Sequence, residues 1–378
     1  MPEHDSDMES QLHERASAMA EGLKDFGDDS YRTGLRLLLR EQATRATEDG
    51  GVVLPDAITE VLMSRLYSQA GWQQTPQCLA DRIVAPIVIA GMPRTGTTLL
   101  HRLLAADPQL QGLPGWLLRT PMIRPPRMTW PAHPNFTAIA RRFQLLDEKA
   151  PDLRAKHENS AEQFDECMWL LAQTFVSPMF GLIADVPGYD AWCMAADLQP
   201  TYRRFADNLK LIGHAEPQRR WLLKAPIHTL YLEALLQVFP DACIVQIHRD
   251  PVVALASNAS LAHTLRGGSQ QDSNVGPRNS AIWSEAVKRS MAAQDRWPER
   301  FHDVDYRAFV RAPIEAVQEI YARFGLELKR SVKNSMCDWL ARHPQGRHGE
   351  HRYSPEQFGL SERAIRATFA GYMERHHL

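Results

Sequence analysis

Between residues 87 and 100 the chain reads Ile87-Val88-Ile89-Ala90-Gly91-Met92-Pro93-Arg94-Thr95-Gly96-Thr97-Thr98-Leu99-Leu100, and this stretch decides its fold. An apolar, β-branched run comes first, then a loop bounded by Gly91 and Gly96, then an apolar helical pattern. This order predicts a buried strand, a loop and a helix. The first N–H groups of a helix lack partners inside it, and the helix dipole adds partial positive charge there. The stretch therefore predicts a loop that holds a phosphate group.

The loop resembles the Walker A pattern G-x-x-x-x-G-K-[ST] but departs from it at one position. Gly91 and Gly96 occupy the glycine positions, and Thr98 occupies the hydroxyl position. Thr97 stands where a nucleoside triphosphatase has the lysine that reaches the β- and γ-phosphates. The loop instead carries a cation earlier, at Arg94, among threonine hydroxyls. This composition favours a smaller phosphate group whose bridging oxygen takes up charge during the reaction.

A second anion-binding signal lies far downstream. Residues 221–224 read as a short buried strand that ends in a lysine, and the apolar spacing over 227–238 predicts a helix. Residues 242–247 read as another strand, which leads into His248-Arg249-Asp250-Pro251 and a helix that carries Ser257. An arginine at a strand end directs two donors onto one phosphate. A local Arg-Asp ion pair and a capping or solvated serine are the alternatives, and the upstream loop favours the anion site.

These segments resemble sulfotransferases that use 3′-phosphoadenosine 5′-phosphosulfate (PAPS). The loop from Pro93 to Thr98 resembles the family's 5′-phosphosulfate loop, and the segment with Arg249 and Ser257 resembles its 3′-phosphate-binding segment. The resemblance implies that the cosubstrate is bound by Arg94, Thr95, Gly96, Thr97, Thr98, Arg249 and Ser257.

A basic, glycine-punctuated stretch over residues 346–354 resembles the C-terminal loop that this family folds over the 3′-phosphate and adenine. Tyr353 is the first candidate in it to bind the nucleotide, followed by His351 and Arg352. A solvated basic linker is the alternative for this stretch.

The implied reaction moves a sulfuryl group from PAPS to a hydroxyl or amine of a small acceptor, with no metal required. Arg94 and the loop N–H groups would stabilise the leaving phosphate, and Lys224 matches the family's lysine that helps hold the sulfuryl group. The general base stays open between two residues. His228 follows Lys224 by four positions, whereas the family's base stands two positions after its lysine, where this chain has Pro226. Glu166 is the rival, on a predicted helix over 160–171.

Glu162 and Glu166 would share one face of that predicted helix, because they are four residues apart.

Two other classes of protein also stay open. A degenerate P-loop kinase or triphosphatase would need an acidic Mg²⁺ ligand at a strand end, for which Asp250 is the nearby candidate. A non-catalytic nucleotide-binding protein would bind adenosine 3′,5′-bisphosphate without consuming PAPS.

Composition limits the classes of partner. The 378 residues include 43 Lys and Arg against 45 Asp and Glu, so the net charge of −2 argues against a nucleic-acid-binding surface. Five dispersed cysteines without a CxxC pair suggest neither a zinc ribbon nor a disulfide scaffold. An acidic, polar N-terminus and the lack of an apolar run near ~20 residues predict a cytoplasmic protein without a transmembrane segment. The aromatic residues and methionines between Trp116 and Trp192 favour an apolar small-molecule acceptor, and a homo-oligomer stays open.

Strands that alternate with helices predict an α/β fold, with a P-loop-like parallel sheet flanked by helices. Helical periodicity over 11–23, 31–47 and 58–70 predicts an N-terminal helical extension. We expect residues 1–80 to form that extension and 81–378 the sulfotransferase domain. The proline-rich residues 112–134 are predicted to be irregular and to line an acceptor pocket or form a packed surface loop. The polar residues 267–277 are predicted to form a loop, as a lid or a linker.

Overall fold

The computed structural model describes residues 2–49, 53–149, 160–266, 275–343 and 354–378. Within it the chain forms two compact units. The first comprises residues 1–83, 113–218 and 265–267, and the second comprises 84–112, 219–264 and 268–378. The first unit thus begins with the expected helical extension but also takes in a long later segment. The expected domain boundary near residue 80 therefore stays a prediction.

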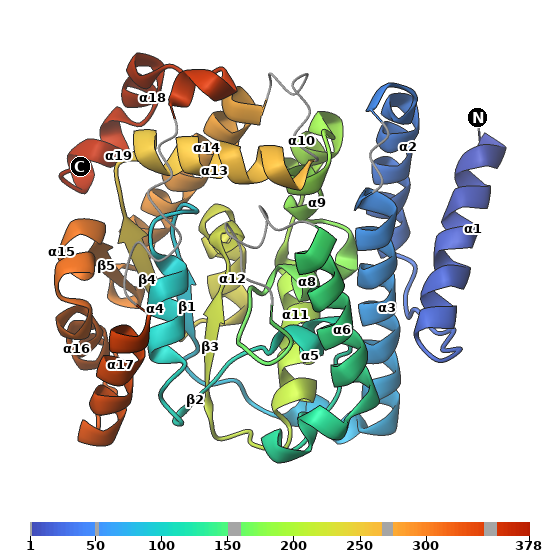
Figure 1. Ribbon diagram of the computed structural model, residues 1–378, viewed down its shortest axis with the longest axis horizontal. Helices are drawn as coiled ribbons and strands as arrows, with labels where there is room; N and C mark the ends of the chain where they lie inside the picture. Colours follow the sequence, from blue (N-terminus) through green and yellow to red (C-terminus); the bar gives the residue numbers. More distant parts are fainter. Residues whose placement is uncertain (1, 50–52, 150–159, 267–274, 344–353) are drawn as a thin grey trace. The chain divides into compact units, whose positions relative to one another are not determined.

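Three N-terminal helices build one side of the first unit, as their periodicity predicts (Figure 1). They are α1 (Pro2–Met19), α2 (Tyr31–Asp49) and α3 (Val53–Gln74), and α1 contacts both others. The later helices of this unit are α5 (Gly115–Arg119), α6 (Pro134–Lys149), α8 (Met168–Leu171), α9 (Met179–Ile183), α10 (Pro187–Ala195) and α11 (Gln199–Gly213). Four of them, α5, α8, α9 and α11, contact α3 opposite α1, so this helix is buried along most of its length.

A buried arginine fixes the turn between α1 and α2 against α3. Arg65 on α3 is fully buried, and its guanidinium donates to the backbone carbonyls of Phe26, Asp28 and Gln173 at 2.6–3.0 Å. The ring of Tyr31 lies against it, with 4.2 Å between Cζ and the ring centroid. A buried guanidinium is tolerated only when its donors are used, and here the carbonyls of an irregular turn use them.

The helix expected over residues 160–171 is wrong in its first half. Backbone groups of residues 161–165 bond across to residues 113–116, through Trp116 N to Ala161 O at 3.1 Å and Asp165 N to Leu113 O at 2.9 Å. These hydrogen bonds replace those of a helix, so the helix α8 begins only at Met168. Glu162 and Glu166 therefore do not share a helix face.

Residues 112–134 are more regular than expected. They include α5 and a 3₁₀-helix, η2 (Arg127–Ala132). Three of the prolines stand where helices accept them: Pro114 and Pro126 precede these two elements, and Pro134 is the first residue of α6. Pro131 lies inside the short η2, next to its last residue.

The second unit is built on a five-stranded parallel sheet, which confirms the expected α/β fold. Its strands are β1 (Ile87–Ala90), β2 (Leu110–Gln111), β3 (Arg220–Lys224), β4 (Cys243–His248) and β5 (Phe301–Asp305), in the order β2-β3-β1-β4-β5. The expected strands over 221–224 and 242–247 are confirmed. β1 is central and fully buried, as an apolar run in a parallel sheet should be. Its register places Ile89 beside Lys224 and Ala90 beside Gln246, so the carboxyl ends of β1, β3 and β4 meet at one edge.

Helices flank this sheet in two groups (Figure 1). One group is α4 (Thr97–Leu104), α16 (Pro313–Arg323) and α17 (Arg330–Arg342), and the other includes α12 (Leu232–Val238) and α14 (Val275–Arg296). The remaining helices are α13 (Pro251–Leu265), α15 (Tyr306–Arg311), α18 (Glu362–Thr368) and α19 (Ala370–Arg375). Among the helices of the described ranges, none combines the length and apolar character needed to cross a membrane.

The helix expected over 227–238 is interrupted. Residues 226–230 form a 3₁₀-helix, η4 (Pro226–Leu230), and α12 begins after Tyr231, whose backbone is not helical. In this tighter turn the hydroxyl of Thr229 accepts a hydrogen bond from the backbone N–H of Gly91 at 2.7 Å, which ties η4 to the end of β1.

Candidate functional site

The loop between β1 and α4 depends on its two glycines. Gly91 has φ +118°, and a Cβ there would lie 2.9 Å from the carbonyl oxygen of Ile247 on β4. Gly96 has φ +92° and caps α4, and a Cβ there would lie 3.2 Å from the ring of Tyr306. Both positions need the left-handed backbone and the small volume that only glycine combines without strain. The loop therefore turns tightly over the sheet edge and presents the first N–H groups of α4.

Arg94 joins the loop to the downstream segment. Its backbone is left-handed, with φ +66°, which is uncommon for a residue with a side chain. In this conformation its carbonyl accepts a hydrogen bond from Nη1 of Arg249 at 2.7 Å, and its own Nε donates to Oγ of Ser257 at 3.1 Å. The structure thus brings together three residues that the sequence places in two distant segments.

The guanidinium of Arg249 is held from two sides. Besides its bond to the Arg94 carbonyl, it lies over the ring of Tyr306, with 4.1 Å between Cζ and the ring centroid. Tyr306 follows the last residue of β5 and also contacts Gly96, so it connects the arginine to the loop. Sequence reasoning missed this tyrosine. The signal that could have found it was its place directly after a strand of the sheet.

Lys224 brings a further cation to the start of α4. It is the last residue of β3, its side chain is buried, and its Nζ donates to Oγ1 of Thr98 at 3.1 Å. The pKa of the neighbouring His101 on α4 is well below its usual value, because of burial and then the charge of Lys224. His101 is therefore a neutral core histidine. Thr95 is also buried, and its hydroxyl donates to the carbonyl of Met92 within the loop.

The resulting site suits an anion with more than one charged group. Three cationic side chains, from Arg94, Lys224 and Arg249, lie around the amino end of α4, where the N–H groups of Thr97 and Thr98 begin the helix. Asp250, the candidate Mg²⁺ ligand of a kinase, caps α13 by accepting from the N–H of Val252 at 2.8 Å. Its other carboxylate oxygen pairs with Arg366. These partners leave Asp250 in a helix-capping role.

The two candidates for the general base have different surroundings. His228 is fully buried in η4, and burial lowers its pKa to about 3. A base of such low pKa withdraws a proton weakly near neutral pH. Glu166 is half-buried in the first unit, just before α8, and its N–H donates to the carboxylate of Asp165 at 2.7 Å.

Tyr353, His351 and Arg352 lie outside the described residues, as does most of the expected loop over 267–277.

A parallel sheet whose central strand leads through a glycine-bounded loop into a helix is a P-loop-like fold, and comparison with known proteins gives its family. Residues 86–330 match the model of the sulfotransferase family, and the chain belongs to that family.

Similar proteins come from mycobacteria. The omega-hydroxy-beta-dihydromenaquinone-9 sulfotransferase Stf3 of Mycobacterium tuberculosis is 25% identical over 329 residues, which are 82% of this chain and 80% of that protein. The crystal structure of sulfotransferase STF1 from M. tuberculosis has a TM-score of 0.87 and 34% identity, covering 96% of this chain and 98% of that one. Sulfotransferase STF9 from Mycobacterium avium has a TM-score of 0.87 and 28% identity, with 97% and 96% coverage.

Proposed function

We propose that this sulfotransferase takes its sulfuryl group from PAPS and transfers it to a hydroxyl of a small, apolar acceptor. One observation carries the choice of donor. Arg249 contacts the backbone of Arg94, and Arg94 contacts Ser257, so a socket for a second phosphate adjoins the loop. A nucleotide with phosphate groups at both the 5′ and 3′ positions matches two adjacent anion sites, whereas ADP lacks the 3′-phosphate.

The proposed roles follow from the placement of the cations. Arg94 and the N–H groups of Thr97 and Thr98 bind the 5′-phosphate, and Lys224 binds the sulfuryl group. The acceptor oxygen attacks sulfur as the bond from sulfur to the phosphate oxygen breaks, and the phosphate keeps the electron pair. The acceptor proton passes to the general base, for which His228 and Glu166 are the candidates. Fixed donors aimed at the leaving oxygen stabilise the charge that develops there.

An apolar, lipid-like alcohol is the proposed class of acceptor. The mycobacterial relative at 25% identity is named for a hydroxylated menaquinone derivative, a long apolar molecule that ends in a hydroxyl. The aromatic residues and methionines between Trp116 and Trp192 favour the same class. An acceptor screen by mass spectrometry, with PAPS supplied and prenyl alcohols compared with sugars and phenols, tests this class. Transfer to sugars alone would contradict it.

Calorimetry with adenosine 3′,5′-bisphosphate and ADP tests the choice of nucleotide. Loss of the contacts to one phosphate removes about 1.5–3 kcal/mol, so we expect the bisphosphate to bind roughly 10- to 150-fold more tightly. Equal affinities, or ATP turnover that depends on Mg²⁺, would support the kinase alternative instead. Transfer of radiolabelled sulfate from PAPS then separates an enzyme from a protein that only binds the nucleotide.

A further inference from the structure

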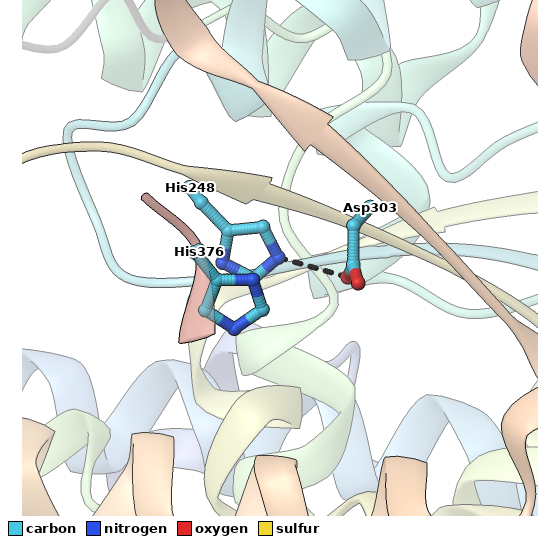
Figure 2. Close-up of side chains that lie close together, drawn as sticks. All are labelled: His248, Asp303 and His376. Carbon is cyan, nitrogen blue, oxygen red and sulfur yellow. Dashed lines mark hydrogen bonds and ion pairs between the residues drawn. The ribbon is translucent and has the colours of Figure 1, made fainter. Parts of the chain in front are cut away.

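Two histidines and an aspartate from three separate elements meet near the C-terminus (Figure 2). His248 ends β4, Asp303 lies on β5, and His376 follows α19. Nε2 of His248 is 2.8 Å from Oδ1 of Asp303, and the rings of the two histidines stack with their centroids 3.6 Å apart. One nitrogen or oxygen atom from each residue lies within 4.8 Å of the other two.

This set of donor atoms matches the ligands that zinc prefers. Zn²⁺ binds histidine nitrogen and carboxylate oxygen at about 2.0–2.2 Å, so tetrahedral ligand atoms are about 3.4 Å apart. The pair of His248 and Asp303 is already close to that spacing. A metal ion lies in the plane of the imidazole that binds it, so His376 must turn its ring out of the stack with His248 and bring a nitrogen, now within 4.8 Å of the other two ligand atoms, closer to them. Its position after the six-residue helix α19 allows this rotation.

His248 and Asp303 each make a further hydrogen bond to a neighbouring side chain, as metal ligands usually do. Nδ1 of His248 lies 3.1 Å from the hydroxyl of Tyr372 on α19, and Oδ2 of Asp303 accepts from the side-chain amide of Gln294 at 2.6 Å. These bonds fix which atom of each residue faces the cluster. An ion pair of 2.7 Å between Arg375 and Asp295 ties α19 to α14 beside it.

We propose that His248, Asp303 and His376 bind one Zn²⁺ ion, which fastens the C-terminal helix α19 to the end of β4. The ion has a structural role in this proposal. His248 directly precedes Arg249, so the ion also fixes the strand end that carries the arginine of the candidate anion site. A small cavity of about 10 Å³ is lined by residues of both regions, among them Gly91, His248, Tyr372 and His376. The zinc site does not depend on PAPS being the sulfuryl donor.

Zinc titration of the full, metal-free chain against a chromophoric chelator tests the proposal. We expect one ion per chain, bound with a dissociation constant in the micromolar range or below. Zn²⁺ should also raise the thermal unfolding midpoint, because a ligand of the folded state stabilises it by mass action. Less than one ion per chain at saturation, or no rise of the midpoint, would overturn the proposal.

Variants identify the ligands. His376→Ala and Asp303→Asn should each weaken zinc binding at least tenfold and remove the rise of the unfolding midpoint. Tyr372→Phe, which removes an outer partner, should weaken it about 10- to 100-fold. His377→Ala is the matched control, because this exposed neighbour lies outside the cluster. Unchanged zinc affinity in His376→Ala, or an equal loss in His377→Ala, would overturn the proposal. His376 is the third residue from the C-terminus, and circular dichroism verifies that its variant folds.

Discussion

At the scale of single residues, Arg94 links the two halves of the candidate anion site. Its left-handed backbone turns its carbonyl to Arg249, and its side chain reaches Ser257. A lysine at position 97, as in a nucleoside triphosphatase, would instead place its cation on the first residue of α4. The arginine in the loop therefore carries both a charge and a structural contact, which lysine could supply only in part.

Replacing Arg94 by alanine tests its role in the transition state. We expect kcat to fall about 10²- to 10³-fold, the usual cost of losing one donor to a developing oxyanion, while the affinity for adenosine 3′,5′-bisphosphate falls far less. Steady-state kinetics and calorimetry give the two quantities. Arg94→Lys, which keeps the charge but loses the Nε contact to Ser257, should recover part of the rate. Unchanged turnover in Arg94→Ala would refute the assignment.

Replacing Arg249 by alanine tests recognition of the 3′-phosphate. The affinity for adenosine 3′,5′-bisphosphate should fall roughly 10- to 150-fold, because charged hydrogen bonds are lost, while the affinity for AMP stays the same. Calorimetry with both nucleotides measures the change. Arg311→Ala, at an exposed position on α15, is the control and should change neither affinity. An equal loss for the two nucleotides would assign Arg249 to another part of the ligand.

The burial of His228 predicts that the free energy of unfolding decreases at acid pH. Its folded pKa of about 3 lies below the ~6.5 of the unfolded chain, so the unfolded state takes up the proton first as the pH falls. Its contribution to stability is complete above about pH 6.5 and is lost progressively towards pH 3. Denaturant unfolding should show stability falling by about 2 kcal/mol between pH 7 and 4.5, with a smaller fall in His228→Gln.

The same pKa separates the two candidates for the general base. If His228 is the base, its titration places the acid limb of the pH–rate profile well below pH 5. An acid limb near pH 6–7 that disappears in His228→Ala would show that the histidine is less shielded in the complex. A fall of tenfold or more in Glu166→Gln, with none in His228→Ala, would assign the base to the glutamate.

At the scale of elements, the loop is shaped by what packs behind it. The Cβ position of Gly96 faces the ring of Tyr306, and that ring in turn lies under Arg249. The amide of Gly91 is bonded to Thr229 of η4. The loop between β1 and α4 thus takes its conformation from β5 and η4 as well as from its own glycines.

Gly96→Ala should therefore destabilise the protein in two ways, through backbone strain and through contact with the Tyr306 ring. The left-handed φ of +92° costs a residue with a side chain about 1–2 kcal/mol, and contact with the Tyr306 ring adds about 1–3 kcal/mol. Gly325→Ala is the matched control, because that glycine has φ +66° and open space around its Cβ position. Denaturant unfolding should show a larger loss for Gly96→Ala. Equal losses would mean that the ring yields without cost.

At the scale of the whole molecule, the order of the strands positions the site. β1 lies between β3 and β4, so the loop after β1 meets Lys224 from one neighbour and Arg249 from the other. In open parallel sheets, ligands bind at the carboxyl ends of the strands where the chain order reverses, and this sheet reverses there. The site is thus a product of topology as much as of the loop.

Hydrogen exchange with adenosine 3′,5′-bisphosphate tests this placement. We expect slower exchange in three segments: the start of α4, the start of α13, and residues 305–308 at the start of α15. The helix α17, which carries none of the candidate site residues, provides an internal reference with unchanged exchange. Protection confined to α17 or to β2 would contradict a site at the carboxyl ends of β1 and β4.

Local sequence patterns predicted the parts whose structure depends on neighbours in the chain. The apolar runs predicted β1, β3 and β4, because a buried strand needs apolar residues on both faces. The spacing of Gly91, Arg94 and Gly96 indicated a phosphate loop, and helical periodicity found α1, α2 and α3. The sequence by itself thus determined the class of fold and the residues from which a site is proposed.

Only the tertiary structure decided how distant segments complete one another. Residues 161–165 bond to 113–116 instead of forming a helix, and Thr229 of η4 accepts a hydrogen bond from Gly91 at the end of β1. The place of Tyr306 beneath Arg249 and the meeting of His376 with His248 also join segments far apart in the chain. A local pattern carries no record of such partners, because their hydrogen bonds and ring contacts form only once folding has brought the distant segments side by side.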